Sequence, residues 1–182
     1  YLPSRFPVAP LAGSDGIAAG FSVTIPSHNP IEFLKLTRAL LANPDLTTEE
    51  MMEIMPGPDW GVGASVINSK KAIASYFDNG TGKLTARSTF ENIDGDVVLK
   101  EIAPTGSGLR KTLGQIRDKI RAGEITTLSG AEDHSDMDKG THVVFTLRRG
   151  KKYDDAVAEL YSKTSLEDTY SVNMVFTDRD DI

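Results

Sequence analysis

The stretch GSDGIAAGFSVTIPSHNP, residues 13–30, carries the most distinctive pattern of the chain. One large aliphatic residue, Ile17, lies among glycines and alanines, and a β-branched run follows it. Because glycine reaches backbone conformations that other residues disfavour, we expect extended segments and turns up to residue 29. Asn29 and Pro30 then predict the start of a helix, since Asn is a good N-cap and Pro suits the first helical position.

Downstream of this stretch, helical and strand patterns alternate. Helical spacing of apolar residues and capping signals predict helices over residues 30–42, 48–55, 70–77, 109–122 and 154–162. Alternating or β-branched runs predict strands over residues 64–67, 83–88, 96–102, 125–128, 142–147 and 170–176. Asp94 and Gly95 form a typical hairpin dipeptide, which we expect to join the second of these strands to the third.

These patterns favour an α+β fold in two parts. Pro56-Gly57-Pro58 marks a boundary between a helical and loop segment over residues 1–58 and an α+β domain over residues 59–182. The simplest packing for the second part has two layers, with helices on one face of a mainly antiparallel sheet.

The composition excludes several classes of site. The 182 residues include no cysteine, which rules out disulfides, thiolate metal sites and a cysteine nucleophile. The net charge of −6 argues against binding a polyanion through bulk charge, so any nucleic-acid contact needs local basic groups. No apolar run approaches the ~20 residues that span a bilayer, and the first residues lack a signal-peptide pattern. We therefore expect a cytoplasmic protein with no membrane partner.

No motif supplies a complete catalytic set. The glycines at 13 and 16 are not followed by the Gly-Lys-Ser/Thr of a phosphate-binding loop. Gly106-Ser107-Gly108 lacks the spacing of a nucleophile elbow, and Ser107 is better explained as a helix cap. The acidic run at 132–138 lacks the ligand spacing of a calcium loop and favours a solvated turn. We therefore expect no metal or cofactor site in this chain.

Two features could contact phosphate groups. The predicted helix at 109–122 has a basic face opposite its apolar stripe, and a basic run follows the strand at 142–147. The residues concerned are Arg110, Lys111, Arg117, Lys119, Arg148, Arg149, Lys151 and Lys152. A solvated turn and a solvated helix face are the alternative interpretation.

Ile17 allows two interpretations. Aliphatic side chains usually lie in a core, which would place Ile17 beneath a glycine turn. An apolar side chain displayed on a turn of small residues could instead pack into a partner or wedge between base pairs. The two interpretations predict opposite exposures for this side chain.

Further motifs resemble one family along nearly the whole chain. The most specific are Leu2–Pro7, Gly13–Gly20 and Ile25–Asn29. Looser, collinear matches follow at residues 43–47, 57–60, 79–83, 100–102, 160–161, 164–166 and 172–175. Together they resemble the breakage-reunion subunits of the bacterial type IIA topoisomerases, the A subunit of DNA gyrase and its topoisomerase IV counterpart, in the region after the active-site tyrosine.

The resemblance implies a role at the DNA gate. In this family, the breakage-reunion subunit cleaves both strands of a duplex through paired tyrosines, and a second duplex passes through the break. Ile17 stands at the position of the family's DNA-bending wedge, and residues 60–177 resemble its tower domain. The DNA-binding candidates are then Arg5, Ser14, Gly16, His28 and Asn29, together with the eight basic residues named above.

The resemblance also implies what the reaction needs from elsewhere. The active-site tyrosine would precede Leu2, so we expect this chain alone not to cleave DNA. The implied partners are double-stranded DNA, an ATPase/TOPRIM subunit that holds ATP and Mg²⁺, and a second copy of the intact subunit. Asp15 departs from the family by placing a negative charge beside the wedge. Gly61–Ala64 is a second departure, because the family has Pro-Thr-Gly-Gly near this position. The alternatives are a non-catalytic DNA- or protein-binding module of the same ancestry and a purely structural α+β domain.

Overall fold

The computed structural model describes residues 6–60, 63–104, 108–138 and 140–176. Its helices there are α1 (Val8–Ala12), α2 (Pro30–Ala42), α3 (Thr48–Ile54), α4 (Lys70–Asn79), α5 (Gly108–Arg121) and α6 (Tyr153–Lys163). Its strands are β1 (Ser14–Ala18), β2 (Phe21–Ile25), β3 (Ser65–Val66), β4 (Thr81–Arg87), β5 (Thr89–Ile93), β6 (Asp96–Glu101), β7 (Leu128–Asp133), β8 (Val143–Leu147) and β9 (Glu167–Asn173).

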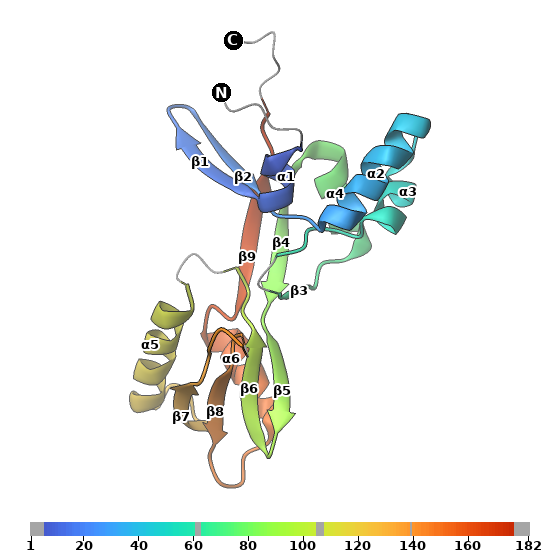
Figure 1. Ribbon diagram of the computed structural model, residues 1–182. Coiled ribbons are helices and arrows are strands. Elements are labelled where there is room, and N and C mark those ends of the chain that lie inside the picture. The colour runs from blue at the N-terminus through green and yellow to red at the C-terminus, as the bar shows by residue number, and fades with distance from the viewer. Residues whose placement is uncertain (1–5, 61–62, 105–107, 139, 177–182) are drawn as a thin grey trace. The chain divides into compact units, whose positions relative to one another are not determined.

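The strands form two antiparallel sheets, in the orders β1-β2-β9-β4-β3 and β5-β6-β8-β7 (Figure 1). The predicted α+β class is confirmed. The difference from the prediction is that the strands make two sheets, where one had been expected.

The chain divides into two units. The first holds residues 1–61, 68–84 and 170–182, and the second holds residues 62–67 and 85–169. This division differs from the predicted boundary after residue 58, because the chain returns to the first unit twice. β4 and β9 each contribute residues to both units. Such returns depend on the pairing of distant strands, which local sequence patterns do not reveal.

The helices of the first unit begin where the sequence supplies caps. Asn29 Oδ1 accepts hydrogen bonds from two backbone N–H groups of the first turn, at 3.0 and 3.4 Å, so α2 begins as predicted. Thr47 and Glu50 form a reciprocal capping box at the start of α3. The short helix α1 was not predicted, and it includes Pro10, which a first turn tolerates because its missing N–H would be unpaired there.

In the second unit, α5 and α6 pack against the four-stranded sheet. Leu113, Ile116 and Ile120 of α5 join Leu160 of α6 and Phe145 of β8 in one buried cluster. This confirms the apolar stripe predicted for α5, since spacings of three and four residues keep side chains on one helix face.

One hairpin of this sheet differs from its prediction. Asp94 and Gly95 make the turn with positive φ, as expected, but they join β5 to β6. The strand at 83–88 belongs instead to the other sheet, because β4 ends at Arg87. Ser88 lies between β4 and β5, is buried, and donates its backbone N–H to the carbonyl of Leu166 at 2.8 Å. Because this contact is made with a distant segment, the sequence around Ser88 carries no local signal that β4 ends there.

Candidate nucleic-acid interface

β1 and β2 form the hairpin that presents Ile17. The strands pair with Ile17 opposite Ser22, and Ala19 and Gly20 make a two-residue loop. Gly20 has a φ of 93°, a conformation that glycine adopts without a side-chain clash. Within the first unit, the hairpin extends to the side away from α2 and α3 (Figure 1).

The side chain of Ile17 is exposed. Its exposed fraction is 94%, so the interpretation of Ile17 as a core residue of this chain is wrong. The neighbouring Gly16 is also open, because a Cβ placed on it would meet no atom within 4 Å. An approaching surface can therefore reach the backbone beside Ile17.

The strand β9 holds the hairpin from its flank. Asn173 pairs with β2, and its Nδ2 donates to the carbonyl of Ser22 at 2.6 Å. The hydroxyl of Tyr170 interacts with the carboxylate of Asp15. Burial raises the pKa of Tyr170 to about 12, and the charge and hydrogen bond of Asp15 add to the rise. The Tyr170 hydroxyl therefore keeps its proton beside Asp15, which lies two residues before the exposed Ile17.

The candidates near the hairpin have different environments. Ser14 and Gly16 are exposed on β1. Asn29 caps α2 with its Oδ1, and its Nδ2 donates to Asp59 Oδ2 at 3.3 Å. Arg5 lies outside the described residues.

His28 lies in the interior. Its exposed fraction is 4%, and its Nδ1 is 2.7 Å from the carbonyl oxygen of Pro10. Its Nε2 is hydrogen-bonded to the hydroxyl of Tyr76. The structure therefore does not present His28 at the surface, where the resemblance had suggested a DNA contact.

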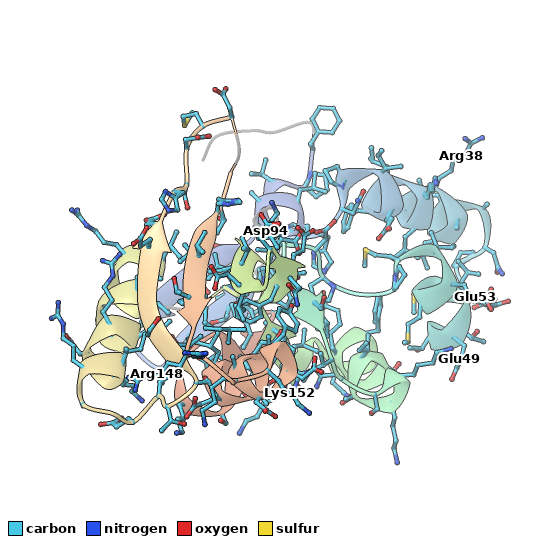
Figure 2. All side chains as sticks on the ribbon, turned by 90° about the horizontal axis from the view of Figure 1, so that it is seen from below. Arg38, Glu49, Glu53, Asp94, Arg148 and Lys152 are labelled. Carbon is cyan, nitrogen blue, oxygen red and sulfur yellow. The ribbon has the colours of Figure 1, made fainter. Side chains whose placement is uncertain are left out.

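The basic candidates belong to α5 and to the loop between β8 and α6, in the second unit. Arg110, Lys111, Arg149, Lys151 and Lys152 are exposed. Figure 2, which draws the side chains as sticks, labels Lys152 and its neighbour Arg148 on this unit. The exposed side chains are free to reach a ligand in solution.

Three other basic candidates use a donor on the protein itself. Arg117 Nε donates to the carbonyl of Ala131 at 2.9 Å, and Arg148 Nε donates to that of Leu128 at 2.8 Å. Lys119 Nζ donates in the same way to a carbonyl at the end of α6, at 2.6 Å. These side chains keep their charge, but their orientation is partly determined by the fold.

The described tyrosines all have raised pKa values. Burial raises the pKa of Tyr76, Tyr153, Tyr161 and Tyr170, so their hydroxyls hold their protons more firmly than an ordinary tyrosine. A nucleophilic hydroxyl needs a base or a lowered pKa. The described ranges also contain no group of three His, Asp or Glu residues that could hold a metal ion. No helix in those ranges has the length and apolarity to cross a membrane.

Comparison with known proteins identifies the relatives of this chain. The family model for the A subunit of DNA gyrase and topoisomerase IV matches residues 1–181. The chain belongs to this family. It is 35% identical over 182 residues to the DNA gyrase A subunit of Granulibacter bethesdensis, and 33% identical over 175 residues to the DNA topoisomerase 4 A subunit of Haemophilus influenzae. It is 32% identical over 177 residues to topoisomerase subunit TopoM of Mycolicibacterium smegmatis.

These three alignments cover most of this chain and a small part of each relative. They include 97%, 96% and 97% of the chain, against 19%, 23% and 24% of the respective relatives. The chain therefore spans about a fifth to a quarter of the length of the curated relatives it matches.

Sequence reasoning did not identify the residues that support the hairpin. Pro10, Tyr76, Tyr170 and Asn173 come from three elements that are far apart in the chain. No motif or spacing links them, because each contacts the hairpin, or His28 just after it, through the tertiary fold. The sequence offered one signal for this support, which was His28, a histidine placed directly before the helix cap Asn29.

Proposed function

We propose that this chain is part of the breakage-reunion subunit of an ATP-dependent type II topoisomerase, where it binds and bends the DNA segment that is cleaved. The observation that carries the proposal is the 94% exposure of Ile17 on a hairpin of small residues. Membership of the gyrase and topoisomerase IV family supports the assignment of this reaction to the intact complex. In the reaction, one duplex passes through another to control supercoiling or decatenation.

Ile17 acts as a wedge between base pairs. An inserted aliphatic side chain partly unstacks one step and kinks the duplex, at a cost that is offset by the extra contacts of the bent DNA. Gly16, Ala19 and Gly20 add no bulk beside it, so the hairpin can approach the minor groove closely. The surface around Ile17 therefore suits a groove of nucleic acid.

The exposed basic residues of the second unit contact phosphates along the DNA. Because the whole chain has a net charge of −6, attraction to DNA must come from local groups. Arg110 and Lys111 on α5 and Arg149, Lys151 and Lys152 after β8 supply such groups. Phosphate contacts position DNA without reading its sequence.

Cleavage itself depends on groups beyond this chain. The raised pKa values of the four described tyrosines argue against any of them as the nucleophile. In our proposal the nucleophilic tyrosine lies elsewhere in the intact subunit, which pairs with a second copy. A partner ATPase/TOPRIM subunit holds Mg²⁺ and ATP. The complex works in the cytoplasm, and this chain alone binds DNA without cutting it.

The test measures DNA bending by energy transfer between dyes at the two ends of a duplex. The intact subunit is used with its ATPase partner and Mg²⁺, and wild type is compared with Ile17→Ala. We expect the variant to lose bending and cleavage while its melting temperature stays unchanged, because the removed side chain is exposed.

The matched control is Met137→Ala, which removes another fully exposed apolar side chain. It should leave both bending and cleavage at the wild-type level. Full bending by Ile17→Ala would overturn the wedge. Bending without any cleavage by the wild-type complex would instead favour a non-catalytic DNA-binding module.

A further inference from the structure

We infer that His28 is a positioning residue for the hairpin that carries Ile17. Its imidazole joins the chain entering the hairpin to the chain leaving it and fastens both to α4. The inference rests on the proposed function of Ile17 and identifies the group that aims the wedge.

The contacts of His28 reach both legs of the hairpin. Pro10 lies on α1, four residues before β1, and His28 lies three residues after β2 ends at Ile25. The 2.7 Å contact from His28 Nδ1 to the Pro10 carbonyl therefore bridges the two legs below the hairpin. The second ring nitrogen contacts Tyr76, which is 2% exposed on α4. One side chain thus links three segments of the first unit.

The partners determine how the imidazole is protonated. A carbonyl oxygen can only accept, so Nδ1 must carry the hydrogen and donate to Pro10. In a neutral ring Nε2 is then an acceptor, and the Tyr76 hydroxyl donates to it. Burial raises the pKa of Tyr76, which keeps that hydroxyl protonated. Each polar atom of the pair therefore has the partner that its chemistry requires.

The surroundings favour the neutral ring. Burial lowers the pKa of His28, while the Pro10 carbonyl and the charge of Asp59 act in the opposite direction. The ring of Phe33 on α2 lies 6.3 Å away, and the Tyr76 ring stacks at 6.0 Å. Asp59 is thus the charged group that faces the imidazole, and Tyr76 is the titratable one.

The hairpin needs this support because its sheet pairing is limited. Among the described residues, β1 is an edge strand and β2 pairs with β9 at Thr24 and Asn173. A two-stranded hairpin is marginally stable in water without further packing. The direction in which Ile17 points therefore depends on how firmly the two legs are held below it.

The hydrogen bond from His28 to the Pro10 carbonyl, which bridges the two legs, is called the clamp below. Two substitutions separate loss of this clamp from simple loss of packing. In His28→Asn, the amide nitrogen lies near the position of Nδ1 and can still donate to Pro10. In His28→Gln, the longer side chain places its amide near Nε2 and leaves the Pro10 carbonyl without its donor. Tyr161→Phe is the matched control, since it removes a tyrosine hydroxyl that donates to the carbonyl of Ser88 in the second unit.

The measurement is amide hydrogen exchange of residues 14–25 in the intact subunit without DNA, followed by DNA bending with the partner. We expect His28→Gln to exchange these amides about tenfold faster, the change that one ordinary hydrogen bond allows, and to bend DNA less. His28→Asn keeps the donor to Pro10 but loses the contact with Tyr76, so it should exchange more slowly and bend DNA more than His28→Gln. Tyr161→Phe should stay near wild type in both.

Equal exchange in His28→Asn and His28→Gln, or an unchanged hairpin in His28→Gln, would overturn the inference. So would faster exchange with full bending, because the clamp would then not aim the wedge. Exchange without DNA judges the clamp alone, whereas bending by Ile17→Ala judges the proposed function, so the two failures are distinguishable.

Discussion

At the scale of single residues, Ala64 has a backbone that its side chain disfavours. Its φ is 116°, a region that residues with a Cβ rarely adopt. The backbone N–H of Ala64 donates to Glu101 Oε2 at 3.3 Å, which helps hold the backbone in this conformation. The neighbouring Gly63 also has a positive φ, of 77°, but carries no side chain to be strained.

We predict that Ala64→Gly stabilises the second unit by about 1 kcal/mol, because glycine relieves the backbone strain. Urea unfolding followed by circular dichroism measures the change. Ala72→Gly is the control: it lies in the first turn of α4, where glycine should instead cost about 0.5–1 kcal/mol. A loss of stability in Ala64→Gly would contradict the prediction.

Glu159 is a buried carboxylate that is fully engaged. It accepts hydrogen bonds from the backbone N–H groups of Thr126 and Thr127 at 2.9–3.0 Å and from Lys163 Nζ at 2.6 Å. Burial by itself would raise the pKa of Glu159, but the hydrogen bonds outweigh it and lower the pKa from 4.5 to about 2. The ionised side chain therefore fastens α6 to the segment before β7.

This shift predicts a pH-dependent stability. Because the folded pKa is the lower one, the stabilisation is complete above pH 4.5 and is lost as the pH falls from 4.5 towards 2. We expect a loss on the order of 2 kcal/mol in the second unit over that window. Urea midpoints from pH 7 to pH 3 should fall less steeply in Glu159→Gln than in wild type. The exposed Glu53→Gln should retain the wild-type slope.

At the scale of elements, the hairpin depends on a glycine at its base. Gly13 has a φ of 77°, and a Cβ there would lie 3.0 Å from the carbonyl oxygen of Ile25. Gly16, three residues later, has open space around it and no positive φ. The two glycines therefore have different roles in the same hairpin, one in backbone geometry and one in surface shape.

We predict that Gly13→Ala destabilises the hairpin by about 1–3 kcal/mol through strain and close contact. The measurement is amide exchange of residues 14–25, which should become faster. Gly16→Ala should leave exchange near the wild-type rate, because its Cβ meets nothing. Equal effects of the two substitutions would contradict this assignment.

The helix α5 joins the core of the second unit through its apolar stripe. Ile116 is fully buried in the core cluster of that unit, whereas its neighbour Gln115 is exposed. Ile116→Ala should cost about 2–5 kcal/mol, since it leaves a cavity in a packed core. Thermal unfolding measures the loss. Gln115→Ala should change the stability little, and a similar loss in both variants would contradict the packing of α5.

At the scale of the whole molecule, DNA binding has to overcome an acidic net charge. We predict that the double variant Arg149→Gln and Lys152→Gln lowers the slope of log affinity against log salt by about 2, because each lost phosphate contact removes about 0.9 from the slope. Binding of the intact subunit to DNA is measured from low to moderate salt. Lys70→Gln with Lys71→Gln on α4 makes the same charge change and should leave the slope unaltered. Equal slopes in both double variants would contradict phosphate contacts by the 149–152 loop.

The sequence by itself determined the α+β class and most of the helices. Caps at Asn29, Thr47 and Ser69 and the apolar stripe of α5 act within a few residues, so local chemistry was sufficient to place them. It also determined the family, because a long collinear set of motifs is a one-dimensional property. Ile17 could be singled out in the same way, from the small residues beside it.

Only the tertiary structure decided how these pieces combine. The split of residues 81–93 between two sheets, the return of β9 to the first unit and the burial of His28 all depend on partners far away in the chain. The exposure of Ile17 belongs here too, since the same residues could have formed a covered turn. Burial and strand pairing depend on contacts between residues far apart in the chain. A local sequence pattern can identify important residues, but it does not show which distant segments pack against them.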